Sequence, residues 1–447
     1  MKPELFGTLD LLIGFGWIIL VFGVAFWIYL VNSTKKHFRW YLPNLGFRIL
    51  FGLLFGAAYA IVLTEGGDTI AYHDGAFKLS QLFWDSPSEY FMEMFSTPGS
   101  DTIREHFNEE TGYPPSWIYR EPESFFVCKI ISIFSLLSFN SYVAMTIMAS
   151  TFSAFASWRL FKTLKRFDAC PKWIIIVATM FVPTVAFWCS GISKDTFVLG
   201  AFYLIFSYLY PLFIYKERLK LSSLLGILFF GFILYHLRSF MLLAIALPFI
   251  IALLFRWAKL VSENVVLLYV YRVLIAFVMI ISVIGYVQFT GGSIVEENEL
   301  LQEVVVIQKD FAQNKTYTGY RYDLGIDDYS AWGMIKATPL AIITAFYRPF
   351  LWEANSAFLL ISGLESMLLL FLTFRFFFLS GNLIKHLKFI GSKELLIFSI
   401  LFALILGFFV GFTSGLFNVL VRFKAPIMVF IIIFFASRNK EEKKLNI

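Results

Sequence analysis

The chain changes from an apolar to a polar sequence at residues 64–75, which read TEGGDTIAYHDG. An apolar run ends at Leu63, and the polar sequence that follows it continues to about Ser124. The stretch contains three carboxylates and the imidazole of His73, and its paired glycines permit a sharp turn or a close approach to a ligand. Acid–base chemistry at a membrane surface needs such groups, although a solvated acidic loop has the same composition.

The composition indicates a polytopic membrane protein. Of the 447 residues, 59% are hydrophobic and only 15% are charged, and a soluble protein of this length cannot bury that much apolar surface. The net charge of +6 comes from basic residues in short loops between apolar runs, so it is a topology signal and does not indicate nucleic-acid binding. The three cysteines have neither metal-ligand spacing nor the pattern of a disulfide framework.

We predict an all-α fold with about eleven membrane-spanning helices. Each apolar run is close to the length that crosses about 30 Å of hydrocarbon. The predicted spans lie near 10–31, 46–63, 141–161, 173–189, 196–214, 222–236, 239–255, 264–288, 355–377, 395–412 and 426–437.

The basic residues predict the orientation of these helices. They cluster after the first, third, fifth, seventh and ninth predicted spans and in the C-terminal tail, which are all on one side if every run crosses. That side is expected to be cytoplasmic, with the N-terminus outside. We therefore predict a single integral membrane domain over 1–447, with external insertions at 64–140 and 290–354. Within these insertions, Phe125–Phe139 and Pro339–Ala354 are predicted to be interfacial helices.

Several cations occur where this topology places the outer ends of helices: Lys194, Arg238, Arg348, Arg422 and Lys424. Cations on the outer side oppose insertion, so their presence needs a reason. They either reach lipid headgroups and pair with acids such as Asp195 and Glu353, or converge on an anionic ligand such as a lipid phosphate. Guanidinium groups bind phosphate through two parallel hydrogen bonds, which a partly dehydrated site strengthens.

Four short motifs, spread from Gly66 to Pro426, resemble sequences of multi-pass bacterial envelope-glycan proteins. This group comprises the polyprenyl-phosphate-dependent glycosyltransferases of the C-type fold and the related O-antigen-polymerase-like proteins. The motifs are Gly67-Asp68 with Tyr72-His73, Ser190-Gly191 with Lys194-Asp195, Arg348-Pro349-Phe350 with Trp352-Glu353, and Asn418 with Arg422-Phe423-Lys424-Ala425-Pro426.

The resemblance implies transfer or polymerisation of sugars from a polyprenyl-(di)phosphate-linked donor on the outer face of the membrane. In the C-type fold, an acidic residue of the first external loop acts as the base on the acceptor. By this analogy Asp68 is the first candidate and Asp74 the second, with His73 orienting or sharing the proton. This chain departs from the pattern because its acidic segment follows the second predicted helix, where the C-type fold has it after the first. The external segment 290–354 is closer to the polymerases.

The expected ligand-binding residues combine the acidic stretch with the outer cations and their neighbours. No cofactor is expected because fixed cations can neutralise the phosphate, and a divalent cation on Asp68 and Asp74 is the alternative. The binding residues that we predict are Glu65, Tyr72, Lys194, Asp195, His236, Arg238, Arg348, Trp352, Glu353, Asn418, Arg422 and Lys424.

Two other functions fit the same sequence. The first alternative is a transporter or flippase of lipid-linked glycans. The second is a non-catalytic subunit of an envelope assembly or secretion complex, which would bind partners through 64–124 and 290–338. Transporters carry ionisable residues near the middle of their spans, whereas here Glu365 and Arg272 are the only clear candidates, and both lie toward the ends of predicted helices. Charge gathered at one face favours chemistry at the surface of the bilayer, which we expect to be the plasma (inner) membrane of a bacterium.

Overall fold

The computed structural model describes residues 4–62, 67–98, 103–261, 331–378 and 388–438, with short pieces between 267 and 325. These residues form helices joined by turns, and the β-bridge between Arg321 and Leu416 is their sole extended pairing. The chain divides into two compact units. The first is Met1–Arg166 with Thr179–Ser239, and the second is Phe167–Ala178 with Phe240–Ile447.

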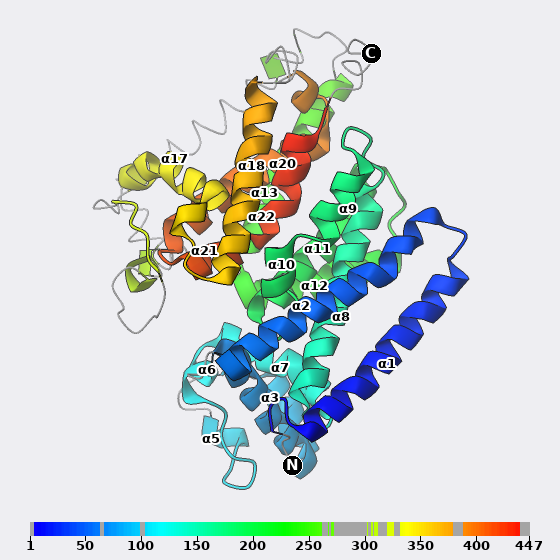
Figure 1. Cartoon of the computed structure of the whole chain (residues 1–447), viewed down its shortest axis with the longest axis vertical. Helices are drawn as coiled ribbons and strands as arrows, with labels where there is room; N and C mark the ends of the chain where they lie inside the picture. Colours follow the sequence, from blue (N-terminus) through cyan, green and yellow to red (C-terminus); the bar gives the residue numbers. More distant parts are fainter. Residues whose placement is uncertain are drawn as a thin grey trace. The chain divides into compact units, whose positions relative to one another are not determined.

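The first unit contains long apolar helices and a group of shorter ones (Figure 1). A 3₁₀ turn, η1 (Lys36–Trp40), precedes α2, and a π-helical turn, η2 (Ala58–Val62), follows it. The helices are α1 (Thr8–Val31), α2 (Tyr41–Ala57), α3 (Asp68–Asp85), α4 (Pro87–Phe95), α5 (Ile103–His106), α6 (Ser116–Arg120), α7 (Pro122–Leu137), α8 (Tyr142–Leu164), α10 (Pro183–Trp188), α11 (Lys194–Phe213) and α12 (Leu221–Arg238). The division between the units falls within α9 (Lys172–Met180).

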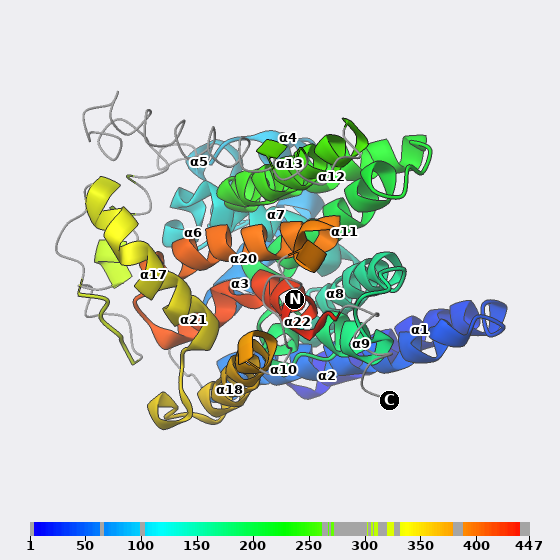
Figure 2. The ribbon, with the colours of Figure 1, turned by 90° about the horizontal axis from the view of Figure 1, so that it is seen from above.

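The second unit is also built from helices in its described part. Figure 2 shows α17, α18, α20, α21 and α22 from above, and α20 packs against α13, α17 and α22. The elements are α13 (Phe240–Val261), α17 (Ala331–Tyr347), η3 (Leu351–Glu353), α18 (Ala357–Phe378), α20 (Glu394–Thr413), α21 (Phe417–Phe423) and α22 (Ala425–Ala436).

The described helices confirm a multi-pass membrane protein. Seven of them are long and apolar enough to cross a bilayer, and the number rises to nine if each of two bent pairs forms one span. The bent pairs are α7 with α8, which meet at 116°, and α21 with α22, which meet at 63°. Most of the predicted span 264–288 lies outside the described residues, so the total of eleven and the orientation remain predictions.

Two predicted spans differ from the observed helices. The span predicted over 46–63 begins earlier, because Pro43 fits the first turn of α2 and η1 extends the apolar helix back to Lys36. The span predicted over 173–189 is two helices, α9 and α10, and Pro183 begins the second because it cannot donate a backbone hydrogen bond within a continuous helix. Because the span that contains α2 begins at Lys36, Arg48 lies well inside it.

The segment predicted as the first external insertion is mostly helical where it is described. Its longest helix, α3, packs against α4, α6 and α7. The predicted interfacial helix Phe125–Phe139 corresponds to α7, and its tight turn into α8 accounts for the 116° bend between them. From Asp68 onward, the acidic stretch therefore belongs to a packed helix.

A buried carboxylate joins α1 to the start of α8. Asp10 is fully buried, and its carboxylate accepts hydrogen bonds from the Ser141 hydroxyl at 2.5 Å and the Val143 amide at 3.1 Å. It also accepts from the Phe6 amide at 2.9 Å. The helices approach closely because Gly14 lacks a side chain, whose Cβ would lie 2.3 Å from the Val143 side chain. An acid at a helix N-terminus satisfies free amides and complements the helix dipole.

We predict that Asp10→Ala destabilises the protein by about 2–3 kcal/mol, because it leaves buried donors without their charged acceptor. Thermal unfolding in detergent, followed by intrinsic fluorescence, measures the loss. Glu109→Ala, at an exposed position of the first unit, is the control. Equal unfolding temperatures for the two variants would show that Asp10 does not secure α8.

Candidate functional site

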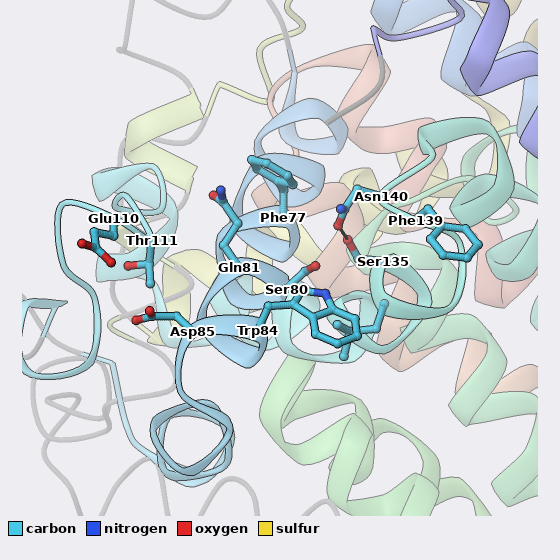
Figure 3. A pocket seen from close by; sticks show the side chains of 11 residues that line it. Phe77, Ser80, Gln81, Trp84, Asp85, Glu110, Thr111, Ser135, Phe139 and Asn140 are labelled. Atoms are coloured by element: carbon cyan, nitrogen blue, oxygen red, sulfur yellow. Dashed lines mark hydrogen bonds between the residues drawn. The ribbon is translucent and has the colours of Figure 1, made fainter. Parts of the chain in front are cut away.

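A cleft in the first unit has a volume of about 460 Å³ and lies along α3 (Figure 3). Figure 3 shows the side chains of α3 between a loop on one side and the end of α7 on the other. The lining residues are Phe77, Ser80, Gln81, Trp84 and Asp85 from α3, Glu110 and Thr111 from the loop, and Ser135, Leu136, Phe139 and Asn140.

The helical repeat of α3 produces one wall of the cleft. Phe77, Gln81 and Asp85 are spaced by four residues, so they lie on one face of the helix. Trp84 flanks them and is 74% exposed. An indole that remains uncovered beside a cleft is available to a ligand.

The opposite wall depends on a strained turn between α7 and α8. Phe139 and Asn140 have φ angles of 52° and 62°, a left-handed conformation that asparagine tolerates and phenylalanine adopts rarely. The Ser135 hydroxyl donates to the Asn140 side chain at 2.5 Å, and His73 Nε2 lies 3.0 Å from the Asn140 carbonyl oxygen. These contacts hold Phe139 at the rim of the cleft, where it is 75% exposed. Such strain persists only where the surroundings impose it, and it concentrates at functional sites.

The lining of the cleft includes two acidic side chains, while the Lys78 ammonium donates to the lining residue Gln81 at 3.3 Å. Asp85 and Glu110 are the ionisable groups that line the cleft, and no lysine or arginine lines it. The Asn108 amide donates to Asp85 at 3.2 Å, which leaves the second carboxylate oxygen of Asp85 as an acceptor. Exposed aromatic rings with carboxylates and amides suit a neutral ligand that carries hydroxyl groups and apolar faces. An anionic phosphate is unsuited to this lining.

The residues predicted to be catalytic occupy different places on α3. Asp68 is exposed in the first helical turn, whereas His73 and Tyr72 are buried. Asp74 is half-buried and stands three residues before Phe77 on the same face of the helix, but it is not among the residues that line the cleft. Glu65 lies outside the described residues.

The predicted cations of the first unit meet acids where α11 begins and α12 ends. Arg238 NH2 lies 2.7 Å from Asp195 Oδ1, and both side chains are largely buried. Lys194 forms an ion pair with Glu123 of α7. One turn further along α7, the Phe126 ring stacks on His236 at 4.9 Å. The structure therefore brings Lys194, Asp195 and Arg238 together, while their roles in binding a ligand remain predictions.

The predicted cations of the second unit form their own group. Arg348 pairs with Glu353 through its Nε and NH2 groups and lies over the rings of Tyr322 and Phe417 at 5.0 and 5.1 Å. The Lys424 ammonium is almost completely buried, and it donates to the Arg348 carbonyl at 3.0 Å and to the Ser366 hydroxyl at 2.9 Å.

The other predicted residues of the second unit lie near these two motifs in the sequence. Arg422 is half-buried, with its guanidinium 5.2 Å from the Phe423 ring, while Asn418 is exposed. Trp352 is 82% exposed and stacks on Phe350 at 4.8 Å. Arg238 belongs to the first unit, so its convergence with Arg348 and Arg422 on one phosphate remains a prediction.

No protein-family model, curated protein or solved structure matches this chain. The function therefore has to be argued from the residues and their geometry. In the described part of the chain, no group of three or more His, Cys, Asp or Glu side chains is arranged to hold a metal ion.

The sequence analysis did not identify a buried charge cluster beside α7. Glu93 of α4 is fully buried, and its carboxylate lies 3.8 Å from the Lys129 ammonium and 3.9 Å from the His106 imidazole. His106 also lies 2.5 Å from Glu89. Glu89 and Glu93 are one helical turn apart, so their side chains lie on the same face of α4. This spacing was the signal in the sequence from which a common binding partner could have been predicted. Burial raises the pKa of Glu93, and the positive charge of Lys129 partly offsets this effect.

The raised pKa of Glu93 makes stability depend on pH. The folded protein holds this proton more tightly than the unfolded chain, whose glutamate pKa is near 4.5, so the folded state binds more protons from pH 4.5 up to the raised value. The free energy of unfolding should therefore fall across this window as pH rises. We predict that Glu93→Gln removes this loss, which is about 1.4 kcal/mol for each unit by which the pKa is raised.

Unfolding temperatures measured between pH 4.5 and 8 test this prediction. The wild type should lose stability relative to Glu93→Gln as pH rises, while Glu109→Gln, at an exposed position, should follow the wild type. Parallel curves for wild type and Glu93→Gln would contradict the assigned shift.

Proposed function

We propose that the protein transfers or polymerises sugars carried on polyprenyl phosphate or diphosphate, and that the cleft along α3 binds the glycan. The lining of the cleft carries the proposal: Trp84 and Phe139 expose aromatic rings, while Gln81, Asp85 and Glu110 supply hydrogen-bond acceptors. A sugar offers an apolar ring face for stacking and hydroxyl groups that donate to carboxylates and amides. The absence of lining cations favours a glycan over an anionic ligand at this position.

The reaction needs a carboxylate beside the bound glycan. The base removes the proton from the acceptor hydroxyl as that oxygen bonds to the anomeric carbon, and the bond from this carbon to the phosphate oxygen breaks with its electron pair leaving on the phosphate. Asp74 suits this role because it lies on the same face of α3 as Phe77, which lines the cleft. Asp68 is the second candidate, since it is exposed in the first turn of the same helix.

The cations of the first unit are proposed to bind the lipid phosphate. Arg238 and Lys194 each pair with a carboxylate, Asp195 and Glu123 respectively. Their positive charges would attract the phosphate oxygens, which gain negative charge as the glycosidic bond breaks. Asp195 and Glu123 would hold the cations in position between reaction cycles.

One observation favours the alternative of a transporter. Arg48 lies well inside a candidate span, where transporters place ionisable residues. However, Arg48 is 1% exposed and lines neither described cavity. We retain glycan transfer as the better-supported function.

We predict that Trp84→Ala lowers the rate of glycan transfer about tenfold, because losing an aromatic platform for a sugar costs about 1.4 kcal/mol. The assay uses a strain that lacks the gene and carries either the wild type or a variant. Surface polysaccharide is quantified on gels, and polyprenyl-linked intermediates are quantified by mass spectrometry.

Trp117→Ala is the matched control, because Trp117 is half-exposed on α6 and does not line the cleft. The intermediates should accumulate with Trp84→Ala and not with Trp117→Ala. Wild-type polysaccharide and intermediates in a well-expressed Trp84→Ala strain would exclude the cleft as the glycan site.

We predict that Asp74→Asn lowers the transfer rate by a factor of about 10²–10⁴, as expected for loss of a general base, and that the protein remains folded. Asp68→Asn, on the same helix, is measured in the same assay. A severe loss with Asp68→Asn and normal transfer with Asp74→Asn would move the base to Asp68, whereas normal transfer in both would refute catalysis from α3.

A further inference from the structure

Arg48 carries a positive charge deep inside a membrane-spanning helix. It lies near the middle of the 26-residue candidate span Lys36–Ile61, and its side chain is 1% exposed. An ionisable group so far from either end of a span is costly unless its charge and its donors are matched.

Protein groups satisfy only part of this guanidinium. Its terminal nitrogens donate to the Val185 carbonyl at 3.3 Å and the Thr179 carbonyl at 3.4 Å, one on each side of the break between α9 and α10. Both bonds are long, and within the described residues the Nε group has no hydrogen-bond partner. No carboxylate of the described chain forms an ion pair with Arg48.

Other buried donors surround the same position. Tyr203 of α11 is 1% exposed, and its hydroxyl has no hydrogen-bond partner among the described residues. Tyr203 and Cys189 are both close enough to Arg48 to interact with its charge. Ser190, which follows Cys189, is fully buried and its hydroxyl also lacks a partner in the described structure. Three side chains with unused donors therefore lie in one region of the first unit.

The backbone around Ser190 is held against α2 and α8. The Ser150 hydroxyl of α8 donates to the Ser190 carbonyl at 2.8 Å. On α2, one turn after Arg48, a Cβ at Gly52 would lie 2.8 Å from that same carbonyl oxygen. The glycine thus permits the close approach that brings the Cys189–Ser190 turn beside the helix of Arg48.

We propose that Arg48, Tyr203 and Ser190 bind a monovalent inorganic anion, of the size of chloride, inside the first unit. Such an ion accepts hydrogen bonds from the Arg48 Nε–H group and both hydroxyls, and it balances the guanidinium charge. A water molecule would accept the same hydrogen bonds and leave the charge unmatched. The three side chains are at most 1% exposed and line neither described cavity, which favours a small ion over a phosphate or a carboxylate ligand.

The bound anion would connect three elements of the first unit. Arg48 belongs to α2, Tyr203 to α11, and Ser190 to the turn between α10 and α11. Lys194 and Asp195 begin α11 directly after that turn, so the anion stabilises the frame that positions them. This site does not depend on the glycan proposal, because it requires no substrate.

The test uses the full chain in lipid nanodiscs at constant ionic strength, with sodium chloride compared against sodium gluconate. Chloride should raise the unfolding temperature by about 2–4 °C, with saturation, since a ligand that binds only the folded state stabilises it. Equilibrium binding of radioactive chloride should reach about one ion per chain. Equal unfolding temperatures in the two salts, or no bound chloride, would overturn the proposal in favour of buried water.

Variants locate the ion. Tyr203→Phe removes one hydroxyl and keeps the ring, so it should remove most of the chloride-dependent shift and weaken chloride binding about tenfold. Arg48→Gln should abolish both. Tyr208→Phe, on the same helix, should behave like the wild type. A full chloride response in Tyr203→Phe together with Ser190→Ala would place the ion elsewhere and refute the assignment, even if Arg48→Gln fails to fold.

Discussion

The helices of this protein are governed by one constraint: in a bilayer, the buried polar groups of the backbone have to be satisfied within the protein. The break between α9 and α10 frees backbone carbonyls, and Arg48 donates to carbonyls on both sides of it. Asp10 satisfies amides at the start of α8 in the same way. Asn44 joins α2 to α8 by donating to the Ala154 carbonyl at 2.8 Å and accepting from the Ser157 hydroxyl at 3.1 Å. Apolar packing alone would not fix the register of these helices.

The candidate site depends on this frame. α8 starts where Asp10 and Ser141 cap it, and the strained turn at Phe139 and Asn140 immediately precedes that start. His73, from α3, contacts the same turn. The acidic stretch that divides the apolar and polar parts of the sequence therefore contributes a structural histidine, His73, to the same helix whose later residues line the cleft.

The sequence predicted the membrane class and most helix positions because long apolar runs have few alternatives. It did not predict the cleft, since Trp84 and Asp85 are far in sequence from Glu110 and Phe139, and only the packing of α3 on α7 brings them together. Arg48 was overlooked for a different reason: the start of α2 was placed at residue 46, which made the arginine a helix-end residue. Aromatic Trp40 and Tyr41, with Pro43 in the first turn, were the signals for an earlier start.

The ion pairs of Lys194 and Arg238 show the limit of reading cations from sequence alone. Both explanations considered for the outer cations, pairing with acids and binding an anion, predict the same residues, and the acids Glu123 and Asp195 are adjacent in space to the cations. The geometry adds a separate cleft on α3 whose lining residues include no lysine or arginine. A lipid-linked sugar has two chemically different ends, and we propose that each end binds at one of these two kinds of site.

The most direct measurement is an experimental structure of the protein in lipid nanodiscs with the polyprenyl-linked glycan extracted from the strain that encodes it. The account predicts sugar density in the cleft, stacked on Trp84 and within hydrogen-bond distance of Asp85 or Glu110, with a carboxylate of α3 beside it. Glycan density at another position, with this cleft filled by solvent, would contradict the proposed function.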